Sequence, residues 1–264
     1  PDGILVEIIE NDIPKTDLPD TSKQEIAKII KDVSDTGFYS KNRFHSMEHI
    51  AKVVMFSYLL GKKEKLTEEE MKLLLVSAAF HDCGRNGNDG ENEHAEAGAK
   101  LAGEYFTKNL TNPFNINEED IPIIQVVIHY HEHKEQELGK LNKDGILFLV
   151  KKYNTPSDKI SEIEKLCMLL KDADALDRER FATYGKLDPK YLRSKSAKTP
   201  QMLKYAKEIN QAVAKEILKR IYGIENIKEE IDSVKLLEEL KIKKVKMLGE
   251  ETSLSVEEIL DLLF

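Results

Sequence analysis

Capping boxes, in which a Ser or Thr is followed three residues later by Glu, recur along this sequence and predict helix starts. They are Ser22 with Glu25, Thr67 with Glu70, and Ser255 with Glu258. Gly37 and Gly61 fall where two helices are expected to end, because glycine readily adopts the left-handed backbone that closes a helix. About a third of the residues are charged and Trp is absent. This composition favours helices over a turn-rich β fold.

The spacing of apolar residues predicts a series of helices, followed by shorter ones toward Phe264. The expected helices span residues 23–36, 47–60, 68–82, 93–109, 118–134, 145–153, 158–172 and 199–221. The fold class is therefore expected to be all-α, a compact helical bundle. We expect a short N-terminal arm over residues 1–22, a central helical domain over 23–184 and a C-terminal extension over 185–264, packed on the same domain. The extension begins with the basic segment KLDPKYLRSKSAK, residues 186–198, which is expected to be irregular.

Charge and cysteine usage narrow the class of protein. A net charge of -8 argues against a broad nucleic-acid surface, although a small basic pocket can still hold a phosphate. Cys83 and Cys167 form no paired pattern, so a reducing compartment, with the cytoplasm as the default, is expected. No apolar run approaches the roughly 20 residues that cross a bilayer, so no membrane association is expected. The sequence contains no P-loop glycine run and no Gly-x-Ser-x-Gly elbow.

The expected helix over residues 68–82 ends on a His and an Asp that both extend its apolar face. Its two apolar stripes consist of Leu74, Ala78 and His81, and of Leu75, Ala79 and Asp82. A carboxylate at the edge of a core requires a counter-charge or a metal ion, because burying it unpaired is costly. The neighbouring His favours a metal ion. The alternative is an Asp that caps the helix and a His that bonds to a backbone carbonyl.

Two more polar residues extend apolar stripes in the same way. His49 precedes Val53, Phe56 and Leu60 on its stripe, and Asp174 follows Ile163, Cys167 and Leu170 on its own. Imidazole nitrogens combined with carboxylates suit Mn, Fe, Co, Ni or Zn better than Ca. The sequence therefore predicts a divalent metal site, for which Mg also remains a candidate.

The segments EHIAKV, SAAFHDCGR and LLKDADALD resemble, in order and separation, the three hallmark segments of the HD-domain metal-dependent phosphohydrolase superfamily. The resemblance covers roughly residues 44–181, a little over half of the chain. It implies that the metal ligands are His49, His81, Asp82 and Asp174. Among the acids of the third segment it favours Asp174, and Asp172 and Asp177 remain candidates for orienting a ligand or contacting the substrate.

The other histidines leave open whether one or two metal ions are bound. His94 resembles the additional His that many family members place over the metal or use as an acid–base group; the alternative is a His that merely begins a helix. His131 continues an apolar stripe, whereas His129 and His133 face elsewhere. If His94 and His131 both reach the site, they can hold a second metal ion, as in the two-metal branches of the family. Otherwise the triplet is a solvated helix end.

Further candidates surround this set. His45 and His129 are weaker candidates for a second metal ion or for the substrate, and His45 could equally pack in a loop near Phe44. Arg85, Arg178 and Arg193 are candidates for phosphate binding, because a guanidinium pairs bidentately with phosphate oxygens. Asp82, Arg85 and His94 are the expected catalytic residues.

These motifs predict a hydrolase that cleaves a phosphoester or phosphoanhydride. The resemblance to the family implies that the substrate is a phosphorylated small molecule, a nucleotide or a nucleotide-like phosphodiester. Two alternatives stay open. One is a phosphodiesterase that acts on a nucleotide-modified protein and docks it on the basic segment 190–198. The other is a catalytically idle HD module that senses a nucleotide. The sequence does not predict an oligomeric state.

Overall fold

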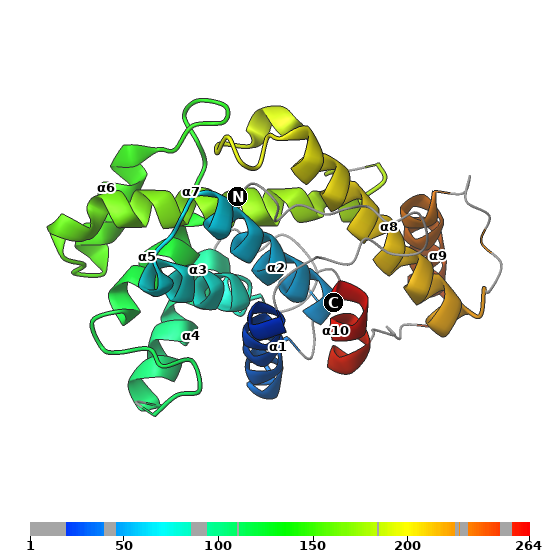
Figure 1. Cartoon of the computed structure of the whole chain (residues 1–264), viewed down its shortest axis with the longest axis horizontal. Coiled ribbons are helices and arrows are strands. Elements are labelled where there is room, and N and C mark those ends of the chain that lie inside the picture. Colours follow the sequence, from blue (N-terminus) through cyan, green and yellow to red (C-terminus); the bar gives the residue numbers. More distant parts are fainter. Residues whose placement is uncertain are drawn as a thin grey trace.

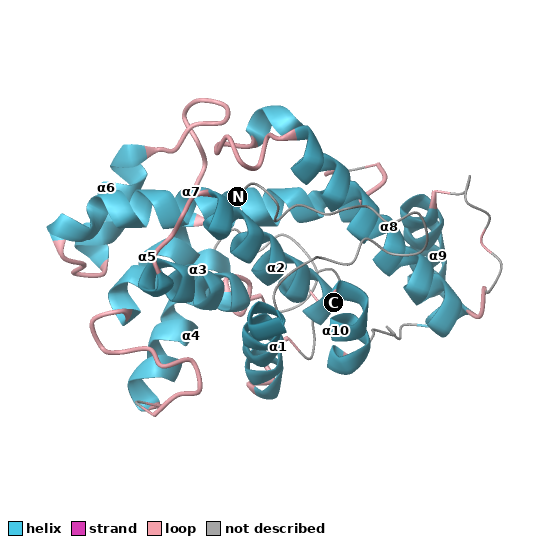
Figure 2. Ribbon diagram, viewed as in Figure 1, coloured by secondary structure: helices cyan, strands magenta, loops and turns pink. Residues whose placement is uncertain are grey.

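The computed structural model describes residues 20–39, 46–85, 94–109, 111–183, 185–224, 227, 232–248 and 255–264. Within these residues the regular structure is entirely helical, and no strand occurs (Figures 1 and 2). The helices are α1 (Asp20–Asp35), α2 (Met47–Lys63), α3 (Glu68–Phe80), α4 (His94–Lys108), α5 (Ile121–Tyr130), α6 (Lys143–Lys152), α7 (Ile160–Leu176), α8 (Pro200–Tyr222), α9 (Ser233–Leu248) and α10 (Val256–Leu263). Short 3-10 helices η1 (Ser157–Lys159), η2 (Asp177–Arg180) and η3 (Pro189–Tyr191) join them. The all-α prediction is confirmed.

Helix α2 is the centre of the bundle. It packs against α1, α3, α7, α10 and η2 (Figure 1). Its residues are buried without interruption from Glu48 to Gly61. The sequence predicts one apolar stripe on this helix, and the structure buries the polar faces as well, including Lys52.

The elements on either side of α2 build the two ends of the molecule in Figure 1. At one end α5 packs against α3, α4, α6 and α7. At the other, α8 packs against α9 and η2, and α10 packs against α1, α2 and α8. The C-terminal helices therefore lie directly on the elements that carry the predicted site.

The capping boxes at Thr67 and Ser255 are confirmed. Each hydroxyl accepts a hydrogen bond from the backbone N–H three residues on, and each Glu side chain accepts from the backbone N–H of the capping residue. The box at Ser22 is wrong. Helix α1 already includes Asp20, and the buried Ser22 hydroxyl accepts a hydrogen bond from the Tyr58 hydroxyl.

The two glycines that were expected to end helices behave differently. Gly37 follows α1 with a φ of 73° and adopts the left-handed conformation expected after a helix. Gly61 lies inside α2, which continues to Lys63, so the predicted end there is wrong. A Cβ on Gly61 would lie 2.7 Å from Met71 Cε, so this glycine permits close packing of α2 on α3.

Two predicted boundaries matter for the site. The helix predicted over 118–134 is shorter, from Ile121 to Tyr130, and leaves His131 at its C-terminal cap. The helix predicted to end at residue 172 continues to Leu176 and carries Asp174 on helical backbone. Apart from η3, the basic segment 186–198 is irregular. The strand or apolar arm expected in residues 3–12 lies outside the described residues.

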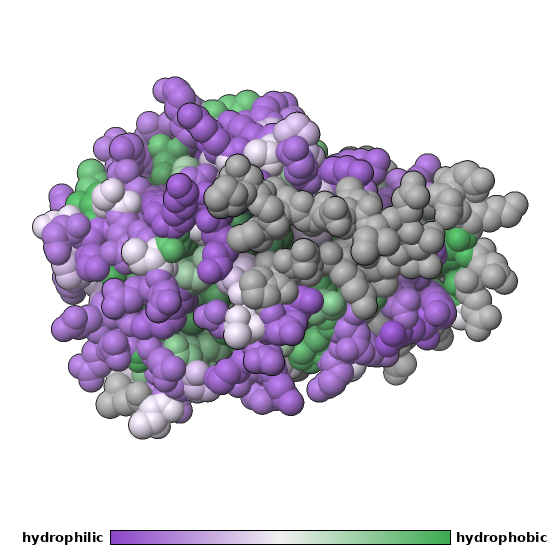
Figure 3. Space-filling view, viewed as in Figure 1, coloured by the Kyte–Doolittle hydropathy of each residue, from purple (hydrophilic) through white to green (hydrophobic). Residues whose placement is uncertain are grey.

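On the face shown in Figure 3, the described residues are mainly hydrophilic, with smaller apolar areas between them. In the described part of the chain, no helix combines the length and the apolar character needed to cross a membrane. Cys83 and Cys167 are both buried. Burial raises the pKa of both thiols far above the ordinary value, so neither provides a reactive thiolate.

Candidate metal centre

The candidate centre lies where the ends of several helices converge. His49 stands in the first turn of α2, and His81 is the C-terminal cap of α3 with Asp82 directly after it. His94 begins α4, His131 caps the C-terminus of α5, and Asp174 lies in the last turn of α7. A helix end directs a side chain inward while the helix itself packs in the bundle. The fold thus collects residues that are up to 125 positions apart.

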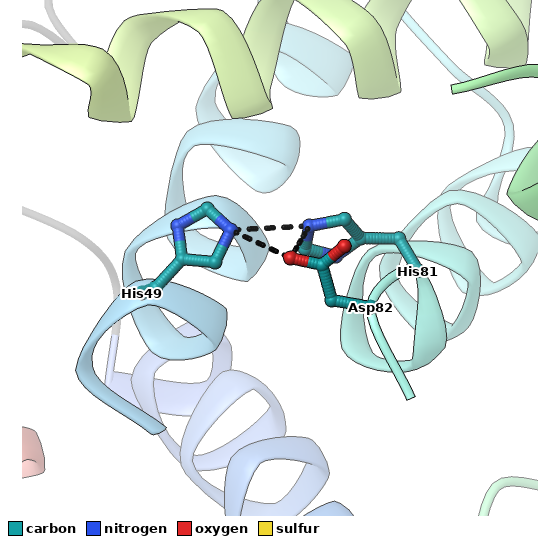
Figure 4. Close-up of side chains that lie close together, drawn as sticks. All are labelled: His49, His81 and Asp82. Atoms are coloured by element: carbon teal, nitrogen blue, oxygen red, sulfur yellow. Dashed lines mark hydrogen bonds and ion pairs between the residues drawn. The ribbon is translucent and has the colours of Figure 1, made fainter. Parts of the chain in front are cut away.

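His49, His81, Asp82 and Asp174 form what we call the first set. The Nε2 atoms of His49 and His81 lie 3.2 Å apart, and each lies 3.4 Å from Asp82 Oδ2 (Figure 4). Asp174 Oδ1 is 3.5 Å from His49 Nε2 and 4.0 Å from His81 Nε2. Ligands held at about 2.0–2.1 Å from one tetrahedral ion are about 3.3–3.4 Å apart. The spacing of His49, His81 and Asp82 fits a common cation.

Asp82, His94 and His131 form the second set. The Nε2 atoms of His94 and His131 lie 3.3 Å apart. Asp82 Oδ1 lies 3.2 Å from the first and 3.5 Å from the second. Both triads, His49–His81–Asp82 and Asp82–His94–His131, are buried groups able to hold a metal ion. The two oxygens of Asp82 therefore face different sets, an arrangement that suits a carboxylate bridging two cations.

All four histidines of the two sets have Nδ1 against an acceptor. A neutral imidazole with its N–H at Nδ1 presents the lone pair of Nε2, which is the form that binds a metal ion. The acceptors are Asp177 Oδ2 for His49 (2.8 Å), the Ala78 carbonyl for His81 (2.7 Å), Glu132 Oε1 for His94 (2.8 Å) and the Ile128 carbonyl for His131 (2.6 Å). These contacts favour the Nδ1–H tautomer in each ring when it is neutral, and they turn every Nε2 toward Asp82.

Burial and charge have opposite net effects on the pKa values of His81 and His94. Burial lowers the pKa of His81 to about 3, although Asp82 opposes this effect, so the ring is neutral at pH 7. Burial alone would also lower the pKa of His94. Its contacts with Asp82 and Glu132 outweigh burial and raise the pKa to about 9. Without a cation, the second set therefore compensates the charge of Asp82 with a proton on His94.

Asp177 orients His49 from behind. Its carboxylate is fully buried, accepts from His49 Nδ1 and from Arg180 Nη1 (2.9 Å), and lies 2.7 Å from Lys52 Nζ. Burial would raise the pKa of Asp177, but the charges of Lys52 and Arg180 outweigh it and hold the pKa well below the usual range. The carboxylate is therefore ionised and accepts the His49 N–H strongly.

Asp172 is turned away from both sets. It accepts hydrogen bonds from the backbone N–H groups of Ser194 (2.7 Å) and Arg193 (2.9 Å) and from Arg193 Nη1 (3.1 Å). Arg193 also pairs with Glu135 and is only 10% exposed. Arg193 is thus engaged by Asp172 and Glu135 and anchors the segment 186–198. Its role in phosphate binding stays a prediction.

Of the other phosphate-binding candidates, Arg85 lies at the second set. Its Nε donates to Asp82 Oδ1 (2.9 Å), and its Nη2 lies 4.0 Å from Glu132 Oε1. Arg178 is exposed, and its Nε donates to the carbonyl of Gly185 (2.5 Å). Only Arg85 therefore combines contact with the centre and partial exposure, since 21% of its side chain is accessible.

The structure also places the weaker histidine candidates. His129 Nδ1 lies 2.8 Å from the Tyr153 hydroxyl and its Nε2 lies 4.0 Å from Glu96 Oε2, so the ring belongs to neither set. His129 and His131 are two residues apart at the end of α5 and point in different directions. His45 lies outside the described residues.

Replacing His129 by Gln is expected to reduce the loss of stability in acid. Burial, aided by the charge of Lys152, lowers the pKa of His129 to about 4. Between about pH 6.5 and 4 the unfolded chain binds a proton here that the folded protein does not, so folding stability falls as pH falls. Gln keeps a partner for Tyr153 without titrating. The free energy of unfolding, measured by thermal unfolding in chelator, should fall less between about pH 6.5 and 4 in the variant than in the wild-type protein. The difference should be no more than about 3 kcal/mol. Identical pH dependence for both proteins would contradict this assignment.

Several residues that support the centre are not predicted from the sequence. Glu132 fixes the ring of His94, and Lys52 neutralises Asp177. Lys52 does carry a signal: it is the only charged residue in the apolar run from Ile50 to Leu60, and a buried Lys needs a partner. Glu132 carries none, because a Glu in the charged stretch HYHEHKE is equally typical of a solvated helix end.

Comparison with known proteins gives one match. Residues 47–179, just over half of the chain, match the sequence model of the family described as HD domain. No curated protein and no solved structure matches the chain. The matched segment contains every residue of both sets, from His49 to Asp174.

Proposed function

The chain belongs to the HD domain family of metal-dependent phosphohydrolases, and we propose that it uses two divalent cations to hydrolyse a phosphoester or phosphoanhydride. The first set would hold one cation and the second set the other, with Asp82 between them. The substrate we propose is a nucleotide or a nucleotide-like phosphodiester; this part of the proposal rests on the family alone.

The observation that carries the proposal is the position of Asp82 between two pairs of oriented histidines. Each Asp82 oxygen lies 3.2–3.5 Å from the Nε2 atoms of one pair. Each of these rings has Nδ1 against an acceptor. Four Nε2 atoms that face one carboxylate, each with Nδ1 held from behind, match the orientation that metal-ligating histidines need.

Bound divalent cations would lower the pKa of water and polarise a phosphoryl oxygen. Asp82 and Asp174 would supply negative charge that offsets the cations, and the four histidines would supply nitrogen ligands. His94 would serve best as a ligand, because Glu132 already engages its Nδ1 and its Nε2 faces Asp82, so a ligating ring would have no nitrogen left to transfer a proton. We therefore prefer this role to the acid–base role that the sequence also suggested.

The accessible side of the centre is marked by its partly exposed side chains. Asp174 and Glu132 are each 33% exposed, whereas Asp82 and the histidines of both sets are almost completely buried. A phosphate that enters on this side meets Arg85, whose guanidinium pairs well with phosphate oxygens. We propose that Arg85 orients the phosphoryl group against the cations.

A substrate screen tests the function. The panel consists of nucleoside mono-, di- and triphosphates, cyclic nucleotides, p-nitrophenyl phosphate and bis-p-nitrophenyl phosphate, each with added Mn, Co, Ni, Zn or Mg. We expect turnover that requires a cation, is abolished by chelator and returns when the cation is restored. Replacing Arg85 by Lys keeps the positive charge but removes the planar guanidinium that pairs bidentately with phosphate. The substitution is expected to raise KM with a smaller effect on kcat.

The screen also distinguishes the alternatives. Two bound cations without turnover of any compound, together with tight binding of a nucleotide, would favour a sensing module over an enzyme. Turnover that persists undiminished in chelator would contradict a metal-dependent mechanism. A nucleotide-modified protein is added to the panel as a further substrate. Its hydrolysis, without hydrolysis of the small phosphodiesters, would favour docking on residues 190–198.

A further inference from the structure

We infer that Lys171 is a positioning residue that assembles the second set, a role that rests on the two-cation proposal above. Lys171 belongs to α7, three residues before Asp174, yet its ammonium group reaches the end of α5. The side chain is buried, with 8% of the residue exposed.

The Lys171 ammonium group binds the backbone just beyond α5. It donates to the carbonyl of His131 (3.0 Å) and to the carbonyl of His133 (2.8 Å). It also lies 5.2 Å from the centre of the Tyr130 ring and 4.0 Å from Glu135 Oε1. These carbonyls follow the last helical residue, Tyr130, so Lys171 supplies donors at a helix C-terminus, where a cation is favoured.

The segment held by Lys171 carries two essential contacts of the second set. His131 presents Nε2 to Asp82. Glu132, between the two bound carbonyls, accepts from His94 Nδ1 and thereby fixes the other ring of the set. One ammonium group thus fixes the backbone from which both histidines of the second set are oriented.

The first set has an equivalent support that is separate from this one. Lys52 lies 2.7 Å from Asp177, which holds His49, and it also donates to Asn210 Oδ1 of α8 (2.5 Å). Lys171, Asp174 and Asp177 occur at intervals of three residues, so they lie on neighbouring positions along α7 and its 3-10 extension. Helix α7, which packs against both α2 and α5 (Figure 1), therefore positions the two sets through different residues.

The test compares Lys171→Met with Lys52→Met by titrating Mn²⁺ into the chelator-treated full chain and following binding by calorimetry and native mass spectrometry. Wild-type protein is expected to bind two ions. Lys171→Met should weaken one binding event by about 10–100-fold and leave the other unchanged. Lys52→Met should weaken one event by a similar factor, and the two variants are distinguished by combining each with His131→Ala.

In the His131→Ala background the second set is already lost. Lys171→Met should then have no further effect on Mn²⁺ affinity, whereas Lys52→Met should still lower the affinity for the remaining Mn²⁺ ion. Circular dichroism and thermal unfolding in chelator establish that each variant is folded. If Lys171→Met does not fold, Lys171→Gln, which retains one donor, is expected to give the same pattern with a smaller loss.

Two outcomes overturn the role of Lys171 alone: wild-type affinity for both ions in the folded variant, or an equal loss of affinity with and without His131. Wild-type protein that binds one Mn²⁺ or none would instead contradict the two-cation proposal itself. The two failures are therefore distinguishable by the stoichiometry of the wild-type protein.

Discussion

Replacing Asp82 by Asn is expected to remove both cations and to lower kcat/KM by at least about 10³-fold. The amide keeps the shape of the side chain but presents only one oxygen and no charge. Because Asp82 Oδ2 faces His49 and His81 while Oδ1 faces His94 and His131, the loss affects both sets together. Metal analysis by mass spectrometry and steady-state kinetics measure the two effects.

The matched control is His131→Ala, which removes a residue of the second set only. It is expected to retain the cation of the first set, whereas Asp82→Asn retains neither. The rise in thermal stability that cations give the wild-type protein should be smaller in His131→Ala and absent in Asp82→Asn. Retention of both cations by folded Asp82→Asn would contradict the bridging role.

Substitution of the two acids in the segment LLKDADALD is expected to separate metal binding from folding. Asp174→Asn should lower the affinity of the first set for its cation by about 10–100-fold. The free energy of unfolding in chelator should stay nearly unchanged. Asp174 is 33% exposed and faces the two histidines of the first set. Cation titration and unfolding in chelator measure the two quantities.

Asp172→Asn is the matched control and should behave in the opposite way. Its carboxylate accepts hydrogen bonds from two backbone N–H groups and from the guanidinium of Arg193. The substitution should therefore lower the free energy of unfolding by about 1–3 kcal/mol and leave the binding of both cations unchanged. If Asp172→Asn instead lost the first cation while Asp174→Asn kept it, the assignment of Asp174 would be wrong.

Periodicity predicts these positions because a ligand at the edge of a core must extend an apolar stripe. His49, His81, Asp82 and Asp174 all do so, and the structure brings them together. The same reasoning predicts the helices, since each must bury an apolar face. For α2, periodicity predicts a single buried stripe, and this prediction is incomplete. The other faces of α2 pack against α10 and η2, which are distant in the sequence.

Partners between distant segments are the part that one sequence does not reveal. A stripe indicates which face of a helix is buried, but not that Asp177 will meet His49 or that Lys171 will meet the end of α5. The predicted helix over 118–134 was too long for this reason. The carbonyls of His131 and His133 are bound by Lys171 instead of by a continuing helix. His131 thereby reaches the centre as a helix cap.

The most direct test of the two-cation centre is a crystal structure of the protein with Mn²⁺, in which anomalous scattering locates the ions. We expect two peaks on opposite sides of the Asp82 carboxylate, one beside His49, His81 and Asp174 and the other beside His94 and His131. A single peak beside the first set would contradict the two-cation centre. The absence of any peak at Asp82 would contradict the metal centre as a whole.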